Sequence, residues 1–161
     1  MDGLYDRDIL LWSEQQADLL RRLAAGERVN DAVDWTNLID EVESVGRSEL
    51  NATESLIEVA LRHLLLAHAS PQPEPVQHWL AEAQAALDSA RDRFSPSMAQ
   101  RLRLTEKWRR AHRFAERKLQ AMGGPSRPLP PACPYTLAEL LAPEADIDAL
   151  LARLTAPSSA S

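Results

Sequence analysis

Three polar residues on or beside the apolar seams of predicted helices are the first candidates for chemistry. A heptad written from Trp35 puts Glu49 and His63 on one seam of a long helix, where eight of ten seam positions are apolar. His112 lies beside the seam of a later predicted helix. Inward-facing Glu and His are the side chains from which helical bundles build metal sites. The three residues could therefore form a metal-dependent or hydrolytic centre. The alternative is that each is a buried polar group satisfied by a neighbouring helix.

The spacing of these residues argues against a preformed metal site. Glu49 and His63 are about 21 Å apart along a continuous helix, so each needs a partner from another helix. The Glu-x-x-His pair of helical metal centres is missing. His112 and Glu116 are four residues apart and could share a metal or simply form a hydrogen bond. We therefore predict no metal and no cofactor.

Charge is distributed unevenly between two predicted helices. The later helix carries a basic stripe with three- and four-residue spacing, which comprises Arg103, Lys107, Arg110, Arg113 and Arg117. The stripe is typical of a nucleic-acid or acidic-partner surface, or of a solvated face that pairs with acids of the central helix. The central helix carries an acidic run that we interpret as mostly solvated: Asp40, Glu41, Glu43, Glu49, Glu54 and Glu58.

Motifs specific to a reaction are missing from the sequence. It has no G-x-S-x-G elbow for a nucleophilic serine, and Gly123-Gly124 follows a predicted helix instead of opening one. Cys133, the single cysteine, has no basic residue near it after Arg127, which favours a buried structural thiol over a nucleophile.

The elements that must position these side chains are all predicted to be helices. The central helix, residues 34–69, begins at an Asp34 N-cap and is apolar on nearly every side after Leu56. We therefore expect its first half to be half-exposed and its second half to form the centre of the core. The other predicted helices are residues 6–25, 75–93, 96–122, 136–141 and 143–154.

The fold predicted from these elements is all-α. Each of the four long helices carries one tryptophan on its inner face, which indicates an up-down four-helix bundle. A proline-rich segment at residues 125–134 should lie over the bundle as an extended strap, followed by short C-terminal helices. We predict a single bundle domain at residues 1–154 and a disordered tail at residues 155–161.

Composition narrows the class of protein further. The 161 residues are 45% hydrophobic and 26% charged, which is ordinary for a soluble globular protein, and the net charge is −6. Negative charge disfavours nucleic acid and anionic membranes as partners. The start MDGLYDRD does not have the pattern of a signal peptide, and no apolar run is long enough to span a membrane. The single cysteine fits a reducing cytoplasm.

Three segments of the sequence carry a family resemblance. YDRDILLWSEQQADLLRRL, DWTNLIDEVESVGRSELNATESLIEVALRHLL and CPYTLAELL are similar to the bacterial domain of unknown function twenty-nine family, over residues 5–141. The resemblance implies an all-helical, bacterial, intracellular protein, and it implies no function. It directs attention to four polar residues that match the family pattern: Glu41, Glu43, Glu49 and His63.

The sequence thus leaves three functional hypotheses. We favour a non-enzymatic helical protein-interaction module in the cytoplasm, bound to a protein partner or to a second copy of itself. One alternative is a metal-dependent or hydrolytic enzyme with a Glu/His site at Glu49, His63 and His112. The other is nucleic-acid binding through the basic stripe.

Overall fold

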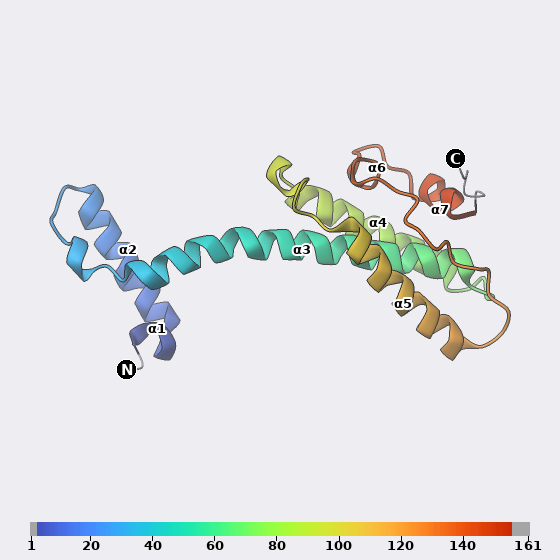
Figure 1. The fold of residues 1–161 in the computed structure, drawn as a ribbon, viewed down its shortest axis with the longest axis horizontal. Coiled ribbons are helices and arrows are strands. Elements are labelled where there is room, and N and C mark those ends of the chain that lie inside the picture. Colours follow the sequence, from blue (N-terminus) through green and yellow to red (C-terminus); the bar gives the residue numbers. More distant parts are fainter. Residues whose placement is uncertain (1–2, 156–161) are drawn as a thin grey trace. The chain divides into compact units, whose positions relative to one another are not determined.

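Every regular element that the structure describes is helical. The structure is a computed structural model that describes residues 3–155, and it contains no strand in that range (Figure 1). The prediction of an all-α protein is therefore confirmed. The α-helices are α1 (Leu4–Arg7), α2 (Ile9–Ala24), α3 (Trp35–Ala69), α4 (Val76–Arg93), α5 (Leu104–Met122), α6 (Leu137–Leu141) and α7 (Ile147–Thr155), with short 3-10 turns η1 (Asn30–Ala32) and η2 (Pro96–Met98).

The long central helix forms as predicted. The backbone N–H of Asn37 donates to the Asp34 carboxylate at 3.3 Å, so Asp34 caps the first turn of α3. The helix ends at Ala69 because Pro71 has no backbone N–H and disfavours helical geometry in the preceding Ser70. Within residues 3–155, no helix combines the length and the apolar character needed to cross a membrane.

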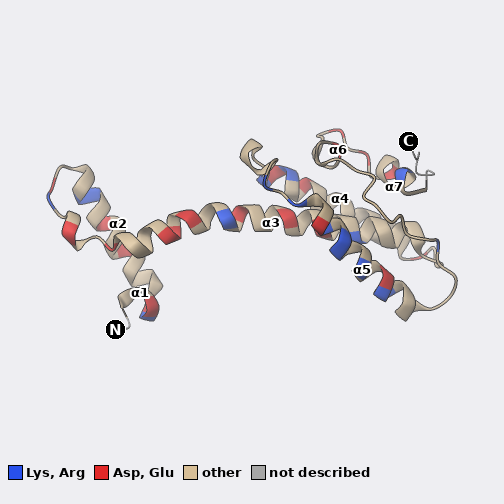
Figure 2. Cartoon of the chain, viewed as in Figure 1, with Lys and Arg blue, Asp and Glu red and all other residues tan. Residues whose placement is uncertain are grey.

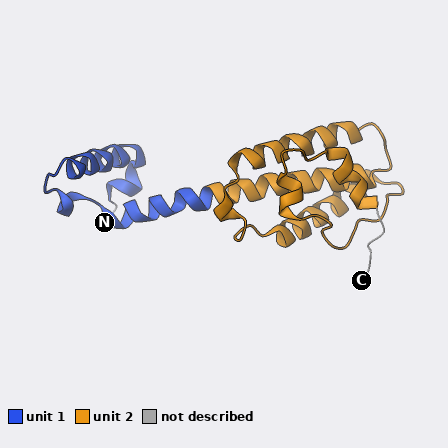
Figure 3. Ribbon diagram, turned by 90° about the horizontal axis from the view of Figure 1, so that it is seen from above, with its two compact units in different colours: residues 1–48 blue, residues 49–161 orange. Residues whose placement is uncertain are grey.

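The chain divides into two compact units, residues 1–48 and residues 49–161 (Figure 3). Unit 1 comprises α1, α2, η1 and residues 35–48 of α3, and unit 2 comprises the rest of α3 and the later helices. The single domain at residues 1–154 stays a prediction. The predicted tail, residues 155–161, lies outside the described residues apart from Thr155, which ends α7.

Unit 2 has a continuous hydrophobic core. Ile57, Leu61 and Leu64 of α3 are fully buried, which confirms that the second half of this helix forms the centre of the core. Side chains of α4, α5, α6 and α7 complete it, and Trp79, Leu87, Trp108, Leu119, Leu140 and Leu154 are among them. The four-helix bundle is not confirmed, because α2 belongs to unit 1 and contributes no residue to this core.

Unit 1 is held mainly by polar contacts around one tryptophan. Trp12 Nε1 donates to Asp34 Oδ2 at 3.0 Å, and the Asp34 N–H donates to Gln16 Oε1 at 2.8 Å. The Tyr5 ring meets the Trp12 ring edge-on, with 4.9 Å between centroids. Trp12 and Val33 are the buried hydrophobic residues among the described part of this unit. Unit 1 therefore lacks a sizeable core of its own, as expected for so short a segment.

Three predicted helix boundaries were wrong. The first helix is interrupted at Asp8, which leaves helical geometry and caps α2 by accepting from the Leu11 N–H at 3.0 Å. The helix predicted from residue 96 begins only at Leu104, because the Arg103 N–H donates to the Glu54 carboxylate at 2.9 Å. The last helix likewise begins at Ile147, after a turn that follows Pro143.

The proline-rich segment forms no helix and crosses the end of α3, in agreement with the predicted strap. The Arg127 N–H donates to the Ala69 carbonyl at 3.2 Å, which satisfies a carbonyl in the last turn of α3. The Pro128 carbonyl lies 3.1 Å from Nε2 of the buried His68. Backbone groups of the strap thus form hydrogen bonds with α3, because a proline-rich segment cannot pair its own backbone groups in regular structure.

The two halves of α3 should respond differently to truncation. Leu61→Ala empties space in a fully buried site and should lower the free energy of unfolding by about 2–5 kcal/mol. Val42→Ala removes an exposed side chain and should change it by about 0.5 kcal/mol or less. Urea unfolding followed by circular dichroism measures both. Equal losses of stability in the two variants would contradict the burial of Leu61 in the core.

Candidate functional site

The structure places Glu49, His63 and His112 in separate surroundings. Glu49 is half-exposed and pairs with Arg93 at 3.1 Å. Nδ1 of His112 lies 3.6 Å from the Glu116 carboxylate on the same helix. Within residues 3–155, no group of three or more His, Cys, Asp or Glu side chains lies close enough to hold a metal ion. The three residues therefore share no site in the described structure.

His63 is a half-buried side chain of α3. Its Nδ1 is buried and has no hydrogen-bond partner among the described residues. Burial lowers the pKa of His63, and the negative charge of Glu82 opposes that shift. The ring is therefore neutral around pH 7. A neutral imidazole without an oriented partner does not have the arrangement of a general base.

Glu41 and Glu43 lie in unit 1 and have different neighbours. The Tyr5 hydroxyl donates to Glu41 at 2.5 Å, and this bond together with burial raises the pKa of Tyr5 to about 12. Glu41 therefore ties α1 to α3. Glu43 is exposed and pairs with Arg47 one turn away at 3.4 Å. Neither carboxylate faces a cavity that the structure describes.

Three residues of the basic stripe form a charge network with two buried carboxylates of α3. Figure 2 shows basic residues of α5 where this helix lies beside acidic residues of α3. Arg103 binds Glu54 at 3.1 Å, and Arg110 lies 3.4 Å from Glu58. The Lys107 ammonium lies between them, 3.6 Å from Glu54 and 3.7 Å from Glu58. These contacts favour the interpretation that the stripe pairs with acids of the central helix.

The charges at the centre of this network are nearly excluded from water. Glu54 is 1% exposed, Lys107 is 5% exposed and Glu58 is 6% exposed. Arg62 forms an additional short ion pair with Glu58. Two buried carboxylates thus face a buried ammonium and three arginines, which compensates charges that would otherwise cost several kcal/mol each to bury.

Glu54 remains ionised in this setting. Burial raises the pKa of its carboxyl group, but the side-chain and backbone hydrogen bonds from Arg103 and the charge of Lys107 outweigh that effect. The net result is a pKa below the ordinary value of a glutamate. A carboxylate whose oxygens are already engaged by cations is a structural group and a poor proton carrier.

Sequence reasoning missed the burial of Glu54 and Glu58, which it assigned to the solvated acidic run. For Glu58 the available signal was its position after Leu56, where α3 is apolar on nearly every side; Glu54 lies just before that part. Glu54 and Glu58 are four residues apart. Arg103, Lys107 and Arg110, at the start of α5, are spaced by four and three residues and can face them. Arg113 and Arg117, the remaining stripe residues, are exposed and make no ion pair within residues 3–155.

An exposed apolar stripe runs along the first half of α3. Trp35, Ile39, Val42 and Val45 are 42%, 55%, 67% and 65% exposed. Their spacing of three and four residues puts them on one side of the helix. Ile9, Leu10 and Leu11 near the start of α2 are also exposed. Large apolar side chains that are exposed together on one side of an element are common at binding surfaces.

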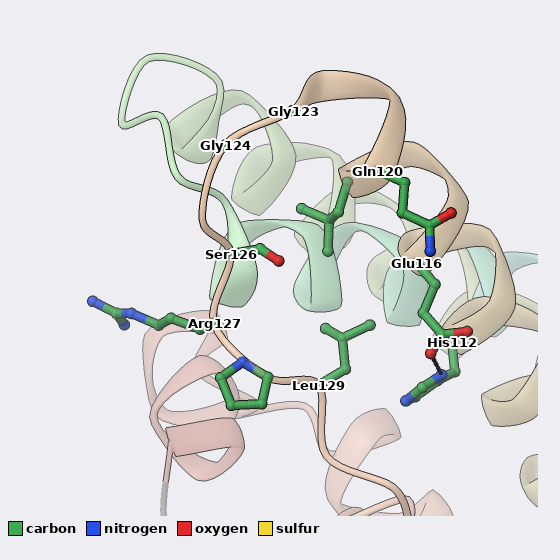
Figure 4. A pocket seen from close by; sticks show the side chains of 10 residues that line it. His112, Glu116, Gln120, Gly123, Gly124, Ser126, Arg127 and Leu129 are labelled. Atoms are coloured by element: carbon green, nitrogen blue, oxygen red, sulfur yellow. Dashed lines mark ion pairs between the residues drawn. The ribbon is translucent and has the colours of Figure 1, made fainter.

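A polar cleft of about 400 Å³ lies where α5 meets the strap (Figure 4). One wall carries His112 and Glu116, joined by the ion pair drawn in the figure, and Gln120. The opposite wall is the turn through Gly123 and Gly124, whose φ angles of 71° and 83° favour glycine. The cleft has mixed donors and acceptors. The hydroxyl of Ser126 also lines it, and within residues 3–155 this hydroxyl makes no hydrogen bond to a general base.

Two comparisons with known proteins yield matches, and neither carries a known activity. The family model described as domain of unknown function DUF29 matches residues 4–145. The crystal structure of an alpha-helical protein of unknown function from Rhodospirillum rubrum is similar, with 30% sequence identity and a TM-score of 0.72. The match covers 93% of this chain and 96% of that chain. No curated protein matches the sequence.

Removal of the shared cation should destabilise unit 2. Lys107→Met leaves two buried carboxylates with fewer compensating charges and should lower the free energy of unfolding by about 3 kcal/mol. Lys118→Met removes an exposed lysine from the same helix and should change it by about 0.5 kcal/mol or less. Urea unfolding at pH 7 measures the difference. Indistinguishable variants would contradict a stabilising role for the network.

The pKa of Glu54 also predicts how stability depends on pH. A carboxyl group with a lowered folded-state pKa stabilises the fold above its unfolded pKa of about 4.3, and that contribution is lost as pH falls through the folded pKa. Glu54→Gln should therefore lose less stability than the wild type as the pH falls from about 5 to about 3. Glu74→Gln, at an exposed position, should follow the wild type. Urea unfolding across this range tests the prediction, which fails if Glu54→Gln and the wild type lose stability in parallel.

Proposed function

The chain belongs to the family described as domain of unknown function DUF29, and we propose that it works as a non-enzymatic helical interaction module. Its binding surface is the exposed apolar stripe of Trp35, Ile39, Val42 and Val45 on α3. This stripe is the observation that carries the proposal. These side chains do not belong to a core of unit 1, which buries little apolar surface.

Helical geometry makes the stripe suitable for another helix. Val42, Val45 and the half-buried Leu38 follow the seam of a heptad pattern, in which apolar side chains of one helix insert between those of its partner. Residues 35–45 span about 15 Å at the usual helical rise, or three turns. A partner helix of similar length can bury all four exposed side chains at once.

The charge around the stripe identifies the chemistry of the partner. Residues 1–48 contain eleven acidic residues against five arginines, whereas residues 49–161 contain thirteen of each sign. Unit 1 therefore carries the whole net charge of the protein. A shallow groove of about 440 Å³ along α2 also joins Leu11 and Leu19 with the acids Glu14 and Asp18. We propose an amphipathic partner helix with apolar and basic faces, because a second copy of unit 1 would bring like charges together.

Contacts in the structure give less support to the two alternative functions. A Glu/His enzyme needs Glu49, His63 and His112 near one another, and each has separate neighbours. Nucleic-acid binding needs free cations, and Arg103, Lys107 and Arg110 are engaged by carboxylates of α3.

We further propose a bacterial cytoplasmic location. The single cysteine supports a reducing compartment, where disulfides do not persist. The similar structure from Rhodospirillum rubrum supports a bacterial source.

A defined peptide tests the proposed surface. A Leu/Lys amphipathic helix should bind the full chain, and its affinity should fall as salt rises. Ile39→Ser with Val42→Ser removes two apolar anchors and should weaken binding about tenfold or more. Isothermal titration calorimetry measures the affinities. A Leu/Glu helix of equal length should not bind.

The matched control is Phe114→Ser, which removes an exposed apolar side chain from unit 2 and should bind like the wild type. Equal binding by the Ile39→Ser/Val42→Ser variant would refute the surface. Sedimentation of the wild type alone should give a monomer. A stable dimer that the double variant abolishes would show that the partner is a second copy, and would overturn the proposed basic helix.

A further inference from the structure

A small cavity on α5 has several hydrogen-bond donors among its lining side chains. It has a volume of about 200 Å³ and is formed by Trp108, Arg109, His112 and Arg113, with Pro131 of the strap on the other side. The indole and both guanidinium groups can donate hydrogen bonds and have no acceptor atoms. No carboxylate lines the cavity. A ligand with acceptor oxygens complements these donors.

Trp108 provides a buried donor that the protein leaves without a partner. Its side chain is 2% exposed, and its Nε1 makes no hydrogen bond within the described residues. The rings of Tyr135 and His112 lie 6.3 Å and 6.4 Å from its ring, centroid to centroid, and hold the indole in place. A buried N–H without an acceptor is unfavourable, so an acceptor that reaches it from the cavity is bound more tightly.

Arg109 and Arg113 supply positive charge that the fold does not neutralise. The arginines that face α3, Arg103 and Arg110, are paired with Glu54 and Glu58. Arg109 and Arg113 make no ion pair within residues 3–155. Guanidinium groups bind the oxygens of carboxylates and phosphates in a bidentate manner.

His112 lines both this cavity and the larger polar cleft at the strap. Its Nδ1 faces Glu116 at 3.6 Å, and Figure 4 shows the other ring nitrogen pointing away from that carboxylate. Glu116 lines the cleft and not the small cavity. Glu116 is therefore not among the side chains that an anion in the small cavity would meet.

We propose that this cavity binds a small oxyanion, with Trp108 Nε1–H, Arg109 and Arg113 as the donors. Its volume lies below the roughly 300–1,000 Å³ of pockets for drug-sized ligands, so it fits a single phosphate or carboxylate group. The site is independent of the apolar stripe in unit 1, and it involves α5 residues that the charge network does not use.

The indole N–H signal of Trp108 reports directly on this site. Inorganic phosphate and acetate are titrated separately into the ¹⁵N-labelled full chain at constant ionic strength, and the assigned signals of the four tryptophans are followed. The Trp108 signal should shift saturably in at least one titration, while those of Trp12, Trp35 and Trp79 stay unchanged. The titration that saturates at lower concentration distinguishes phosphate from carboxylate.

Substitutions then identify the donors. Arg109→Ala with Arg113→Ala should weaken anion binding about tenfold or more, because two charged hydrogen bonds are lost. Arg117→Ala removes an exposed arginine from the same helix outside the cavity, and should retain wild-type affinity. No saturable shift of Trp108, or equal affinity in the Arg109→Ala/Arg113→Ala variant, would overturn the proposal. An equal loss of anion affinity in Arg117→Ala would also overturn the proposed site, because it would show only a general attraction of anions to the positive charge of α5.

Discussion

The register between α3 and α5 depends on one buried ammonium group. Lys107 lies between Glu54 and Glu58, and all three side chains are nearly excluded from water. A shift of α5 by one turn, about 5.4 Å, would leave these charges without partners in a medium of low dielectric constant. Apolar contacts such as those of Ala111 and Ala115 tolerate small shifts much better. The ion contacts therefore specify which turn of α5 faces which turn of α3.

The same interaction determines where α5 begins. The first N–H groups of a helix have no partner within the helix, and Glu54 accepts one of them from Arg103. A carboxylate at a helix N-terminus is also favoured by the helix dipole. Residues 96–103 are consequently held as a 3-10 turn and a loop, with Met98 buried. A single buried acid on α3 thus sets the start of α5 as well as its register.

Sequence patterns predicted what depends on local spacing and missed what depends on tertiary burial. The Asp34 cap, the apolar half of α3 and the short helix predicted at residues 136–141 follow from residues close in sequence. The burial of Glu54 follows from α5 packing over it, and the acid looks like any exposed member of the acidic run. The division into two units was equally hidden, because the heptad pattern continues through residue 48 without a break.

The two faces of α5 show why a stripe of cations is ambiguous in sequence. Neighbouring residues on a helix are about 100° apart around its axis, so Lys107 and Trp108 point in different directions. Lys107 reaches the acids of α3, and Trp108 lines the cavity under the strap with Arg109 and Arg113. Cations on the first face are neutralised within the fold, whereas those on the second remain available to a ligand. The function of each basic residue is thus decided by what packs opposite it, and composition alone cannot show this.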